Sequence, residues 1–401
     1  MYVPDAPGIP DHRERPMTST TRERPATPVP RIGAPARRAS RLSALDGLRL
    51  LCALAVAGYH FGCSWRLDGI HPPAHHLPDA APVLIYGFLG VETFFLISGF
   101  VILMSGWGRT VRGFAASRAA RLYPAFWACV LVTSVVATLL PIDGGLPFAR
   151  LPGPDDVLIN LTMLAEPLNT PLVDTVYWTL WYELRFYLIV ACLIGGGLTD
   201  RRVKLFATGW LLTAVVLPAF PGAALAQVVM PDFAPYFIAG MTMFLLRRDR
   251  RDPWLWGLLL ACWLLGLHRV HGRVLDLDPG FAVPAWPAYA TLTAVFLLLL
   301  AVALGATDRL RLPGLATAGA LTYPFYLLHQ RAGYSLIRTV SEATGWGAGT
   351  VIAGVVLALL GIAWAVHRFI ERPLAPVLNG FLGERRRPHV AAPARPDMRE
   401  V

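Results

Sequence analysis

The sequence predicts an all-α membrane protein, a bundle of about ten transmembrane helices with both termini in the cytoplasm. Two observations predict this fold class. Of the 401 residues, 55% are hydrophobic and only 15% are charged, whereas a soluble globular chain carries about 25% charged residues. Apolar stretches of roughly 20 residues, the length of a helix that crosses a bilayer, recur along the chain. The predicted spans are 45–63, 82–104, 122–141, 177–198, 205–221, 233–246, 254–270, 286–305, 314–336 and 347–366.

The distribution of basic residues predicts the orientation of these spans. With ten crossings, 28 of the 36 Lys and Arg residues fall on the side of the N-terminus and 6 on the opposite side. Basic residues accumulate in cytoplasmic loops, so both tails are predicted to be cytoplasmic. The bias requires an even number of crossings and therefore supports the helix count independently. The stretch 157–165 is too short to cross and is expected at the outer interface.

The two ends of the chain have compositions typical of tails. Residues 1–41 are rich in Pro, Arg and Thr and have no apolar periodicity, which predicts a disordered cytoplasmic tail. We expect residues 42–373 to form the membrane domain and residues 374–401 to form a second disordered cytoplasmic tail.

Charge and cysteine content narrow the range of functions. The net charge is +10, but the basic residues lack the interleaved aromatic residues of a nucleic-acid-binding surface, so no nucleic-acid partner is expected. The five cysteines lie mostly within apolar stretches and lack metal-type spacing, which predicts neither disulfides nor a metal site. The histidines of His71-Pro-Pro-Ala-His-His76 are interpreted as loop residues, because nothing in the sequence fixes a metal geometry around them.

Ionisable residues inside the predicted spans are candidate functional residues, because a charge within a bilayer is unfavourable and usually marks a functional site. In the first span, Arg49 and His60 are 11 residues apart. That separation is about three helical turns and roughly 16 Å of rise, so the two side chains share one face at different depths. Arg49 is predicted near the cytoplasmic end and His60 in the outer half.

The fourth and ninth spans carry polar groups at the predicted depth of His60. Glu183 falls in the outer half of the fourth span, with Tyr187 one turn below on the same face, and His329 reaches a comparable depth. A carboxylate beside a neutral imidazole fixes its tautomer and stabilises the imidazolium, which favours proton abstraction from a hydroxyl. The structural alternatives are an interhelical hydrogen bond for a histidine and a pair between Glu183 and Arg185.

Two motifs closer to the cytoplasm are further candidates. Arg118 and Arg121 are one turn apart where the third span begins, and clustered guanidinium groups bind the oxygens of a multiply phosphorylated ligand. Positive-inside anchoring alone also explains arginines at this position. Ser98, in Ser-Gly-Phe, offers a nucleophilic hydroxyl, but no histidine or acid has a spacing that marks a triad. The alternative is that these small residues permit close helix packing.

Six motifs together resemble those of the acyltransferase 3 family of bacterial multi-helix membrane proteins. They occur in order between residue 44 and about residue 373. The motifs are Ala44-Leu-Asp-Gly-Leu-Arg49 through His60, Gly90-Val-Glu-Thr-Phe-Phe-Leu-Ile-Ser98-Gly-Phe, Arg118-Ala-Ala-Arg121-Leu-Tyr-Pro124, Trp178-Thr-Leu-Trp-Tyr-Glu183-Leu-Arg-Phe-Tyr187, Thr322-Tyr-Pro-Phe-Tyr-Leu-Leu-His329 and Glu371-Arg-Pro.

The resemblance implies a multi-pass protein of the bacterial inner membrane that transfers an acyl group, commonly acetyl. The donor is a cytoplasmic acyl-CoA, and the acceptor is a hydroxyl of a sugar or a sugar-bearing molecule. The resemblance assigns His60 as the catalytic base and Glu183 as the acid of the fourth-span motif. It makes Arg49 the arginine of the first-span motif and makes Arg118 and Arg121 candidates for binding the CoA phosphates. Our leading hypothesis adds Arg49 to the contacts of the CoA donor.

Three residues are candidate supporting residues of the same site: Ser98, Tyr187 and His329. No metal is expected. Two motifs depart from the usual pattern of the family. Glu92 stands where an aspartate is common. In the fourth span, Trp181 stands where a serine is usual, and Leu184 stands where the motif usually has a second polar residue.

Two functions are compatible with charged residues inside the spans. The first is an O-acyltransferase whose acceptor is a cell-surface polysaccharide or a glycosylated metabolite such as a macrolide. The alternative is a proton-coupled transporter of a small molecule or a lipid-linked sugar, in which the same residues form a proton relay. Inverted repeats with interrupted helices would favour a transporter, and the two halves of the sequence show no corresponding pair.

Overall fold

The protein is described by a computed structural model, which covers residues 43–142, 144, 146, 152–277, 279–308 and 312–383. Within these residues every regular element is helical, as the sequence predicted. The elements before residue 200 are α1 (Ser43–Cys63), α2 (Pro73–His76), α3 (Ala81–Leu84), η1 (Ile85–Leu89), α4 (Gly90–Gly106), α5 (Val111–Leu139), α6 (Pro154–Asn160), η2 (Thr175–Tyr177) and α7 (Trp178–Gly195). The later elements are α8 (Asp200–Val216), η3 (Leu217–Ala219), α9 (Leu225–Val229), α10 (Ala234–Arg248), α11 (Pro253–Leu275), α12 (Trp286–Ala303), α13 (Leu315–Leu328), α14 (Arg331–Thr344), α15 (Ala348–Val366), η4 (His367–Glu371) and α16 (Arg372–Leu382).

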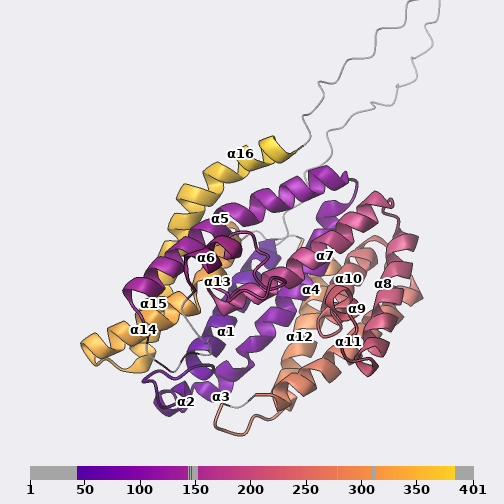
Figure 1. Ribbon diagram of the computed structural model, residues 1–401. Coiled ribbons are helices and arrows are strands. Elements are labelled where there is room, and N and C mark those ends of the chain that lie inside the picture. The colour runs from indigo at the N-terminus through magenta and orange to yellow at the C-terminus, as the bar shows by residue number, and fades with distance from the viewer. Residues whose placement is uncertain are drawn as a thin grey trace, which may run out of the picture. The chain divides into compact units, whose positions relative to one another are not determined.

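Nine helical segments within the described residues are long and apolar enough to cross a membrane. They correspond to nine of the ten predicted spans, and the brief stretch 233–246 is part of a longer segment in which α9 precedes α10. The first residue of α1 and the last residue of α16 lie toward the same end of the helix bundle (Figure 1). We call this the Ser43 end and the opposite one the Cys63 end.

The predicted ninth span, 314–336, is the one that the structure divides. α13 ends at Leu328 and α14 begins at Arg331, so His329 and Gln330 lie at a break between two shorter helices. With 14 residues, α13 is shorter than the roughly 20 residues that a spanning helix needs. Hydropathy does not register such a break, because the apolar residues of α13 and the first apolar residues of α14 follow one another in the sequence. The tenth crossing therefore stays a prediction.

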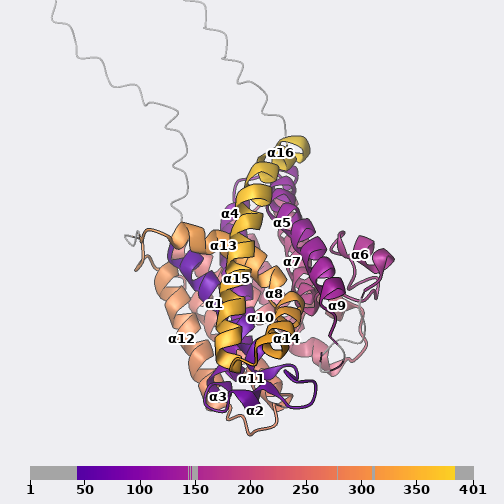
Figure 2. The same cartoon turned by 90° about the vertical axis from the view of Figure 1, so that its left-hand side faces the viewer.

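The prediction of a disordered tail from residue 374 was wrong for residues 374–382. α15 continues through the π-helical segment η4 into α16, which packs against α5 (Figure 2). Leu374, Val377 and Phe381 recur at helical spacing in α16, but this amphipathic run is too short to be recognised as a span. Residues 384–401 and the predicted N-terminal tail lie outside the described residues.

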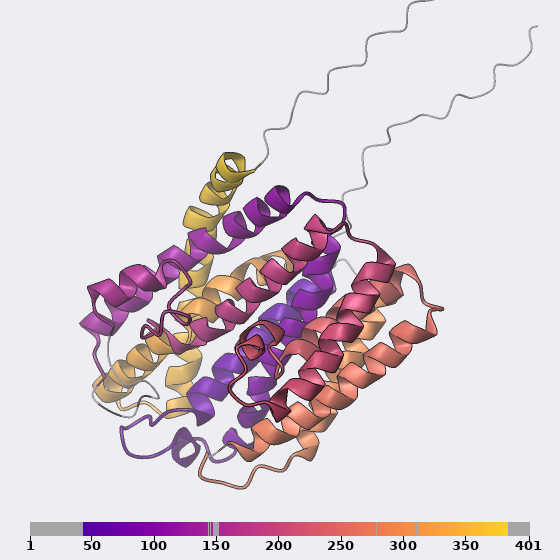
Figure 3. The same ribbon diagram turned by 45° about the vertical axis from the view of Figure 1, so that its right-hand side comes forward.

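The core of the bundle is formed by α4 and α10. Every residue of α10 from Ala234 to Leu246 is buried, and α10 contacts α4, α8, α11 and α12 (Figure 3). Glycines allow the backbones of α4 and α10 to approach each other closely. A Cβ atom on Gly99 would lie 2.1 Å from the backbone oxygen of Phe237, and one on Gly240 would lie 2.1 Å from that of Leu96. The small residues of the Ser-Gly-Phe motif thus permit close helix packing, which was one of the two predicted roles.

Glu92, one of the residues that depart from the family pattern, connects α4 to α11. α11 extends to Leu275, beyond the predicted boundary at 270, so that Arg273 belongs to the helix. Glu92 is fully buried and forms an ion pair with Arg273, whose guanidinium carbon lies 4.9 Å from the ring centroid of Phe88. A buried carboxylate needs such a partner, since an unpaired one is strongly destabilising.

Candidate active site

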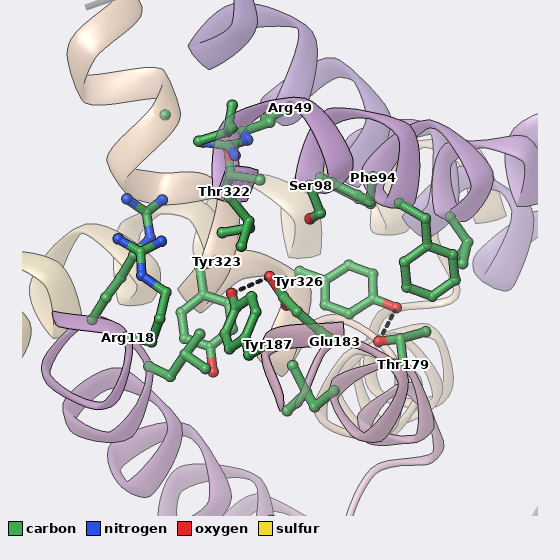
Figure 4. A pocket seen from close by; sticks show the side chains of 18 residues that line it. Arg49, Phe94, Ser98, Arg118, Thr179, Glu183, Tyr187, Thr322, Tyr323 and Tyr326 are labelled. Carbon is green, nitrogen blue, oxygen red and sulfur yellow. Dashed lines mark hydrogen bonds between the residues drawn. The ribbon is translucent and has the colours of Figure 1, made fainter. Parts of the chain in front are cut away.

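A pocket between α1, α4, α5, α7 and α13 collects six of the eight predicted site residues (Figure 4). It encloses about 100 Å³ of water-accessible space. We call it the arginine pocket. The predicted residues that line it are Arg49, Ser98, Arg118, Arg121, Glu183 and Tyr187.

The helix α5 presents two of these arginines to the pocket. α5 begins at Val111, earlier than predicted, and the Thr110 side chain caps it by accepting the Gly113 N–H at 3.1 Å. Arg118 and Arg121 therefore lie within the helix rather than ahead of it. Three residues apart, they share one face of α5.

The three arginines of the pocket form no ion pair with any carboxylate that the structure describes. Within the described part of the chain, no acidic oxygen lies within 4.0 Å of the guanidinium groups of Arg49, Arg118 or Arg121. Arg118 donates to the Ser117 hydroxyl at 3.3 Å, and its Nε is buried without a hydrogen-bond partner. Three guanidinium groups share the pocket with the carboxylate of Glu183, and an anionic ligand would offset the repulsion that remains between them. The arrangement suits a phosphorylated molecule.

Glu183 pairs with a tyrosine rather than with its neighbour Arg185. The Tyr187 hydroxyl donates to the Glu183 carboxylate. Arg185 turns elsewhere: it donates to the backbone and side-chain oxygens of Gln227, and its guanidinium carbon lies 4.1 Å from the ring centroid of Tyr182. The predicted structural alternative, an ion pair between Glu183 and Arg185, was therefore wrong. The carboxylate lines the arginine pocket.

The pocket has a second, more apolar end away from Arg49 and Arg118 (Figure 4). The rings of Phe94 and Tyr326 meet edge to face with 5.6 Å between centroids. The Tyr326 hydroxyl lies 3.0 Å from that of Thr179. The sequence-based prediction assigned no role to these three residues. Tyr326 could have been predicted from the sequence, because it precedes His329 by three residues and so shares its helix face.

His60 and His329, the remaining two predicted residues, pair with each other. His60 Nδ1 lies 2.8 Å from His329 Nε2, and His329 is fully buried. No hydrogen bond or ion pair joins His60 to Glu183 among the described residues, although their predicted depths were similar. Counting residues along a helix gives depth in the bilayer but not the direction in which a neighbouring helix turns its side chains.

The hydrogen bonds of the histidine pair determine where its protons lie. His329 Nδ1 is 2.7 Å from the backbone oxygen of Tyr326. A carbonyl only accepts, so His329 Nδ1 carries the proton and, in the neutral ring, its Nε2 accepts. His60 Nδ1 must then donate to His329, which leaves a lone pair on His60 Nε2. His329 thus fixes the tautomer of His60, a role that was predicted for Glu183.

Tyr326 connects the histidine pair with the arginine pocket. The ring of Tyr326 lines the pocket, and its backbone oxygen accepts a hydrogen bond from His329 Nδ1. The centroids of the Tyr326 and His329 rings are 5.4 Å apart. A ligand whose phosphates lay among the arginines and whose other end reached the Phe94 end of the pocket would approach the two histidines.

Among the described residues, no group of three or more His, Cys, Asp and Glu side chains is arranged to hold a metal ion. In the first loop beyond α1, Asp68 accepts from His71 at 2.6 Å and lies 3.4 Å from His76 Nε2. Asp68 therefore organises these histidines within the loop.

Comparison with known proteins identifies the family. Residues 42–368 match the family model of acyltransferase 3, described as an acyltransferase domain. The chain belongs to the acyltransferase 3 family. It is 30% identical over 305 residues to the exopolysaccharide production protein ExoZ of Rhizobium meliloti, covering 72% of this chain and 89% of that protein. It is 27% identical over 389 residues to the acyltransferase MdmB of Streptomyces mycarofaciens, and this match covers 89% of this chain and 96% of that protein. No solved structure matches.

The family resemblance inferred from six short motifs is thereby confirmed. The matched region begins one residue before α1 and ends within η4, so it includes every helix that contributes to the arginine pocket and the histidine pair. Acyltransferase chemistry is the class of function that this membership supports.

Proposed function

We propose that this protein is a membrane O-acyltransferase that moves an acyl group, commonly acetyl, from cytoplasmic acyl-CoA to a hydroxyl of a carbohydrate or glycosylated acceptor. One observation carries the proposal. In a chain of an acyltransferase family, three arginines that pair with no carboxylate among the described residues converge on a pocket whose other end adjoins the histidine pair. No described feature favours the alternative, a proton-coupled transporter.

The donor lies with its phosphates among Arg49, Arg118 and Arg121. Coenzyme A carries a diphosphate and a 3′-phosphate, and guanidinium groups bind phosphate oxygens in pairs. Arg49 precedes His60 by 11 residues on the same helix, roughly 16 Å of rise. The extended pantetheine arm bridges this length, so the thioester reaches the Phe94 end of the pocket.

His60 acts as the general base. Its Nε2 takes the proton of the acceptor hydroxyl while the hydroxyl oxygen attacks the thioester carbonyl carbon. The carbon–sulfur bond then breaks, the acyl group remains on the acceptor oxygen, and the CoA thiolate takes the proton from His60. His329 accepts the Nδ1–H of the imidazolium throughout and so stabilises its charge.

Glu183, Tyr187 and Ser98 contact the donor within the pocket. Glu183 holds the Tyr187 hydroxyl and partly balances the three arginines, while Ser98 presents a hydroxyl on the opposite wall. Glu183 therefore belongs to the donor side of the reaction rather than to a direct dyad with His60.

The proposed topology places the Ser43 end of the bundle in the cytoplasm. This follows from ten crossings and the positive-inside distribution, and it exposes the arginine pocket to the compartment that contains acyl-CoA. The protein is then a multi-pass protein of the bacterial inner membrane. The acceptor classes are a cell-surface polysaccharide, by analogy with a relative named for exopolysaccharide production, and a glycosylated metabolite such as a macrolide.

The test is an assay of the purified protein in detergent with radiolabelled acetyl-CoA. We expect CoA-dependent labelling of a carbohydrate acceptor, or slow hydrolysis of acetyl-CoA without one. Mass spectrometry of surface glycans and metabolites from a deletion strain would identify the acceptor through the missing acyl mass. Absence of CoA-dependent turnover, with unchanged glycans and metabolites in the deletion strain, would overturn the proposal.

Replacing Arg118 with alanine should weaken donor binding. A hydrogen bond to a charged group contributes about 1.5–3 kcal/mol, so the KM for acyl-CoA should rise about 10- to 100-fold. kcat should change much less, because the phosphates do not react. The matched control is Arg112→Ala on the same helix, whose guanidinium donates to the Leu382 backbone oxygen outside the pocket. Equal KM values for the two variants would contradict the assignment.

Replacing Phe94 with alanine should relax selection for a short acyl chain. The ring closes the apolar end of a pocket that encloses about 100 Å³. A hydrophobic pocket discriminates by about 1–3 kcal/mol for each methylene, so the ratio of kcat/KM for butyryl-CoA to that for acetyl-CoA should rise about tenfold or more. Phe369→Ala, at a ring exposed on η4, is the control. An unchanged ratio in Phe94→Ala would place the acyl chain elsewhere.

A further inference from the structure

The break between α13 and α14 comes directly after a residue of the histidine pair. α13 ends at Leu328, α14 begins at Arg331, and His329 and Gln330 lie between them. The first N–H groups of a helix have no acceptor within the helix. Where such a break is buried, groups from another element must satisfy these donors and so fix the position of the break.

The segment before α7 supplies the acceptor. Asp174 is fully buried, and one carboxylate oxygen accepts the N–H of Arg331 at 2.8 Å while the other accepts the N–H of Val176 at 3.2 Å. Its neighbour Thr175 donates its hydroxyl to the side-chain oxygen of Gln330. Two consecutive residues thus hold both of the residues that follow His329.

The carboxylate is suited to this task. Burial raises the pKa of Asp174 to about 6, while the Arg331 and Val176 N–H groups lower it by stabilising the carboxylate. Both oxygens of the carboxylate accept a backbone N–H. A negative charge at the start of α14 also interacts favourably with the helix dipole.

The position of the break determines the geometry of the histidine pair. His329 Nδ1 is bonded to the Tyr326 backbone oxygen within its own turn, and its Nε2 lies 2.8 Å from His60 Nδ1. On one side of His329, the Tyr326 hydroxyl is bonded to Thr179 of α7. On the other side, Asp174 and Thr175, which directly precede α7, are bonded to Arg331 and Gln330.

We propose that Asp174 is a positioning residue for acyl transfer: by holding the first N–H of α14 it keeps His329 within hydrogen-bond distance of His60. The lone pair of His60 Nε2 then remains available for the acceptor proton. This inference rests on the proposed function, because it gives Asp174 a task only if His60 is the base. Asp174 itself touches neither donor nor acceptor.

The test compares Asp174→Ala with Asn160→Ala. Asn160 is a buried residue of the preceding segment; it accepts the Val173 N–H at 3.0 Å and donates to the Pro171 backbone oxygen at 2.9 Å, without reaching α14. A displacement of about 1 Å in an active site lowers the rate up to about 100-fold. We therefore expect Asp174→Ala to lower kcat about 10- to 100-fold with an unchanged KM for acyl-CoA. Asn160→Ala should keep the wild-type kcat.

A double variant separates positioning from general destabilisation. If Asp174 acts only through His329, then Asp174→Ala combined with His329→Ala should be no slower than His329→Ala alone. Asp174→Asn retains one acceptor oxygen and should recover part of the lost kcat. It also replaces the alanine variant if that protein does not accumulate in folded form. A wild-type kcat in Asp174→Ala, or losses that multiply in the double variant, would overturn the inference.

A measurement that needs no turnover distinguishes failure of this inference from failure of the proposed function. In ¹⁵N-histidine-labelled protein, solid-state NMR reports which ring nitrogen carries the proton, and His60→Gln assigns the His60 signals. We expect His60 to be protonated at Nδ1 in the wild type and to show mixed tautomers in Asp174→Ala. An unchanged His60 signal in Asp174→Ala would refute the positioning role, whereas an inactive wild type with the expected signals would refute only the acyltransferase proposal.

Discussion

Replacing His60 with alanine should abolish acyl transfer while leaving the donor pocket intact. A positioned general base contributes about 10²- to 10⁴-fold to the rate, so kcat should fall by that factor. The KM for acyl-CoA should stay near the wild-type value, because His60 does not line the arginine pocket. The measurement is acyl transfer to the acceptor identified from the deletion strain, with CoA release followed in parallel.

Two comparisons make this prediction specific. His329→Ala should produce an intermediate loss, since His60 keeps its ring but loses the partner that fixes its tautomer. His268→Ala should retain wild-type activity, because this histidine is exposed on α11. A His60→Ala protein that transfers acyl groups at the wild-type rate would remove His60 from the reaction and would leave the arginine pocket without an adjacent base.

The fold class was predictable from sequence because it depends on composition averaged over long stretches. A span of about 20 apolar residues is recognisable whatever its neighbours are, and nine of the ten predicted spans correspond to long apolar helices. What averaging cannot detect is a local backbone change. The break at His329 and Gln330 lies within one apolar stretch, and α16 is a short amphipathic helix whose stability comes from packing against α5.

The members of the candidate site were largely predictable, but their pairing was not. Arg49, Arg118 and Glu183 stood out as charges in apolar surroundings, and the structure places all three on one pocket. The contact between His60 and His329 depends on how α1 and α13 rotate about their axes, and sequence periodicity gives the rotation of each helix only relative to itself. For the same reason Glu183 was expected beside His60.

Asp174 was beyond prediction for a different reason. It lies outside the predicted spans, and an acidic residue in a polar loop does not by itself indicate a functional site. The role proposed for it rests on its burial and on its bonds to two backbone N–H groups, one of them 157 residues away in sequence. Long-range contacts of loop residues leave no periodic signal in the chain.

Replacing Gly99 with alanine should prevent normal packing of α4 against α10 and sharply reduce the yield of folded protein. The added Cβ would lie 2.1 Å from the Phe237 backbone oxygen, which cannot rotate away as a side chain could. Even accommodated overpacking costs about 1–3 kcal/mol, and a clash with backbone at the most buried helix pair should exceed that. Gly240→Ala should behave alike, because its Cβ would meet the Leu96 backbone oxygen at the same distance.

The matched control for these variants is Gly257→Ala on α11, where nothing lies within 4 Å of the added Cβ. Alanine is the better helix former, so this variant should melt at or slightly above the wild-type temperature. The measurement is thermal melting in detergent combined with the amount of monodisperse protein recovered. Equal melting temperatures for Gly99→Ala and Gly257→Ala would mean that α4 and α10 are not in close contact. Because Ser98 and Phe94 reach the pocket from α4, any variant at Gly99 that does fold should also bind acyl-CoA more weakly, which links the tightest helix contact to the donor site.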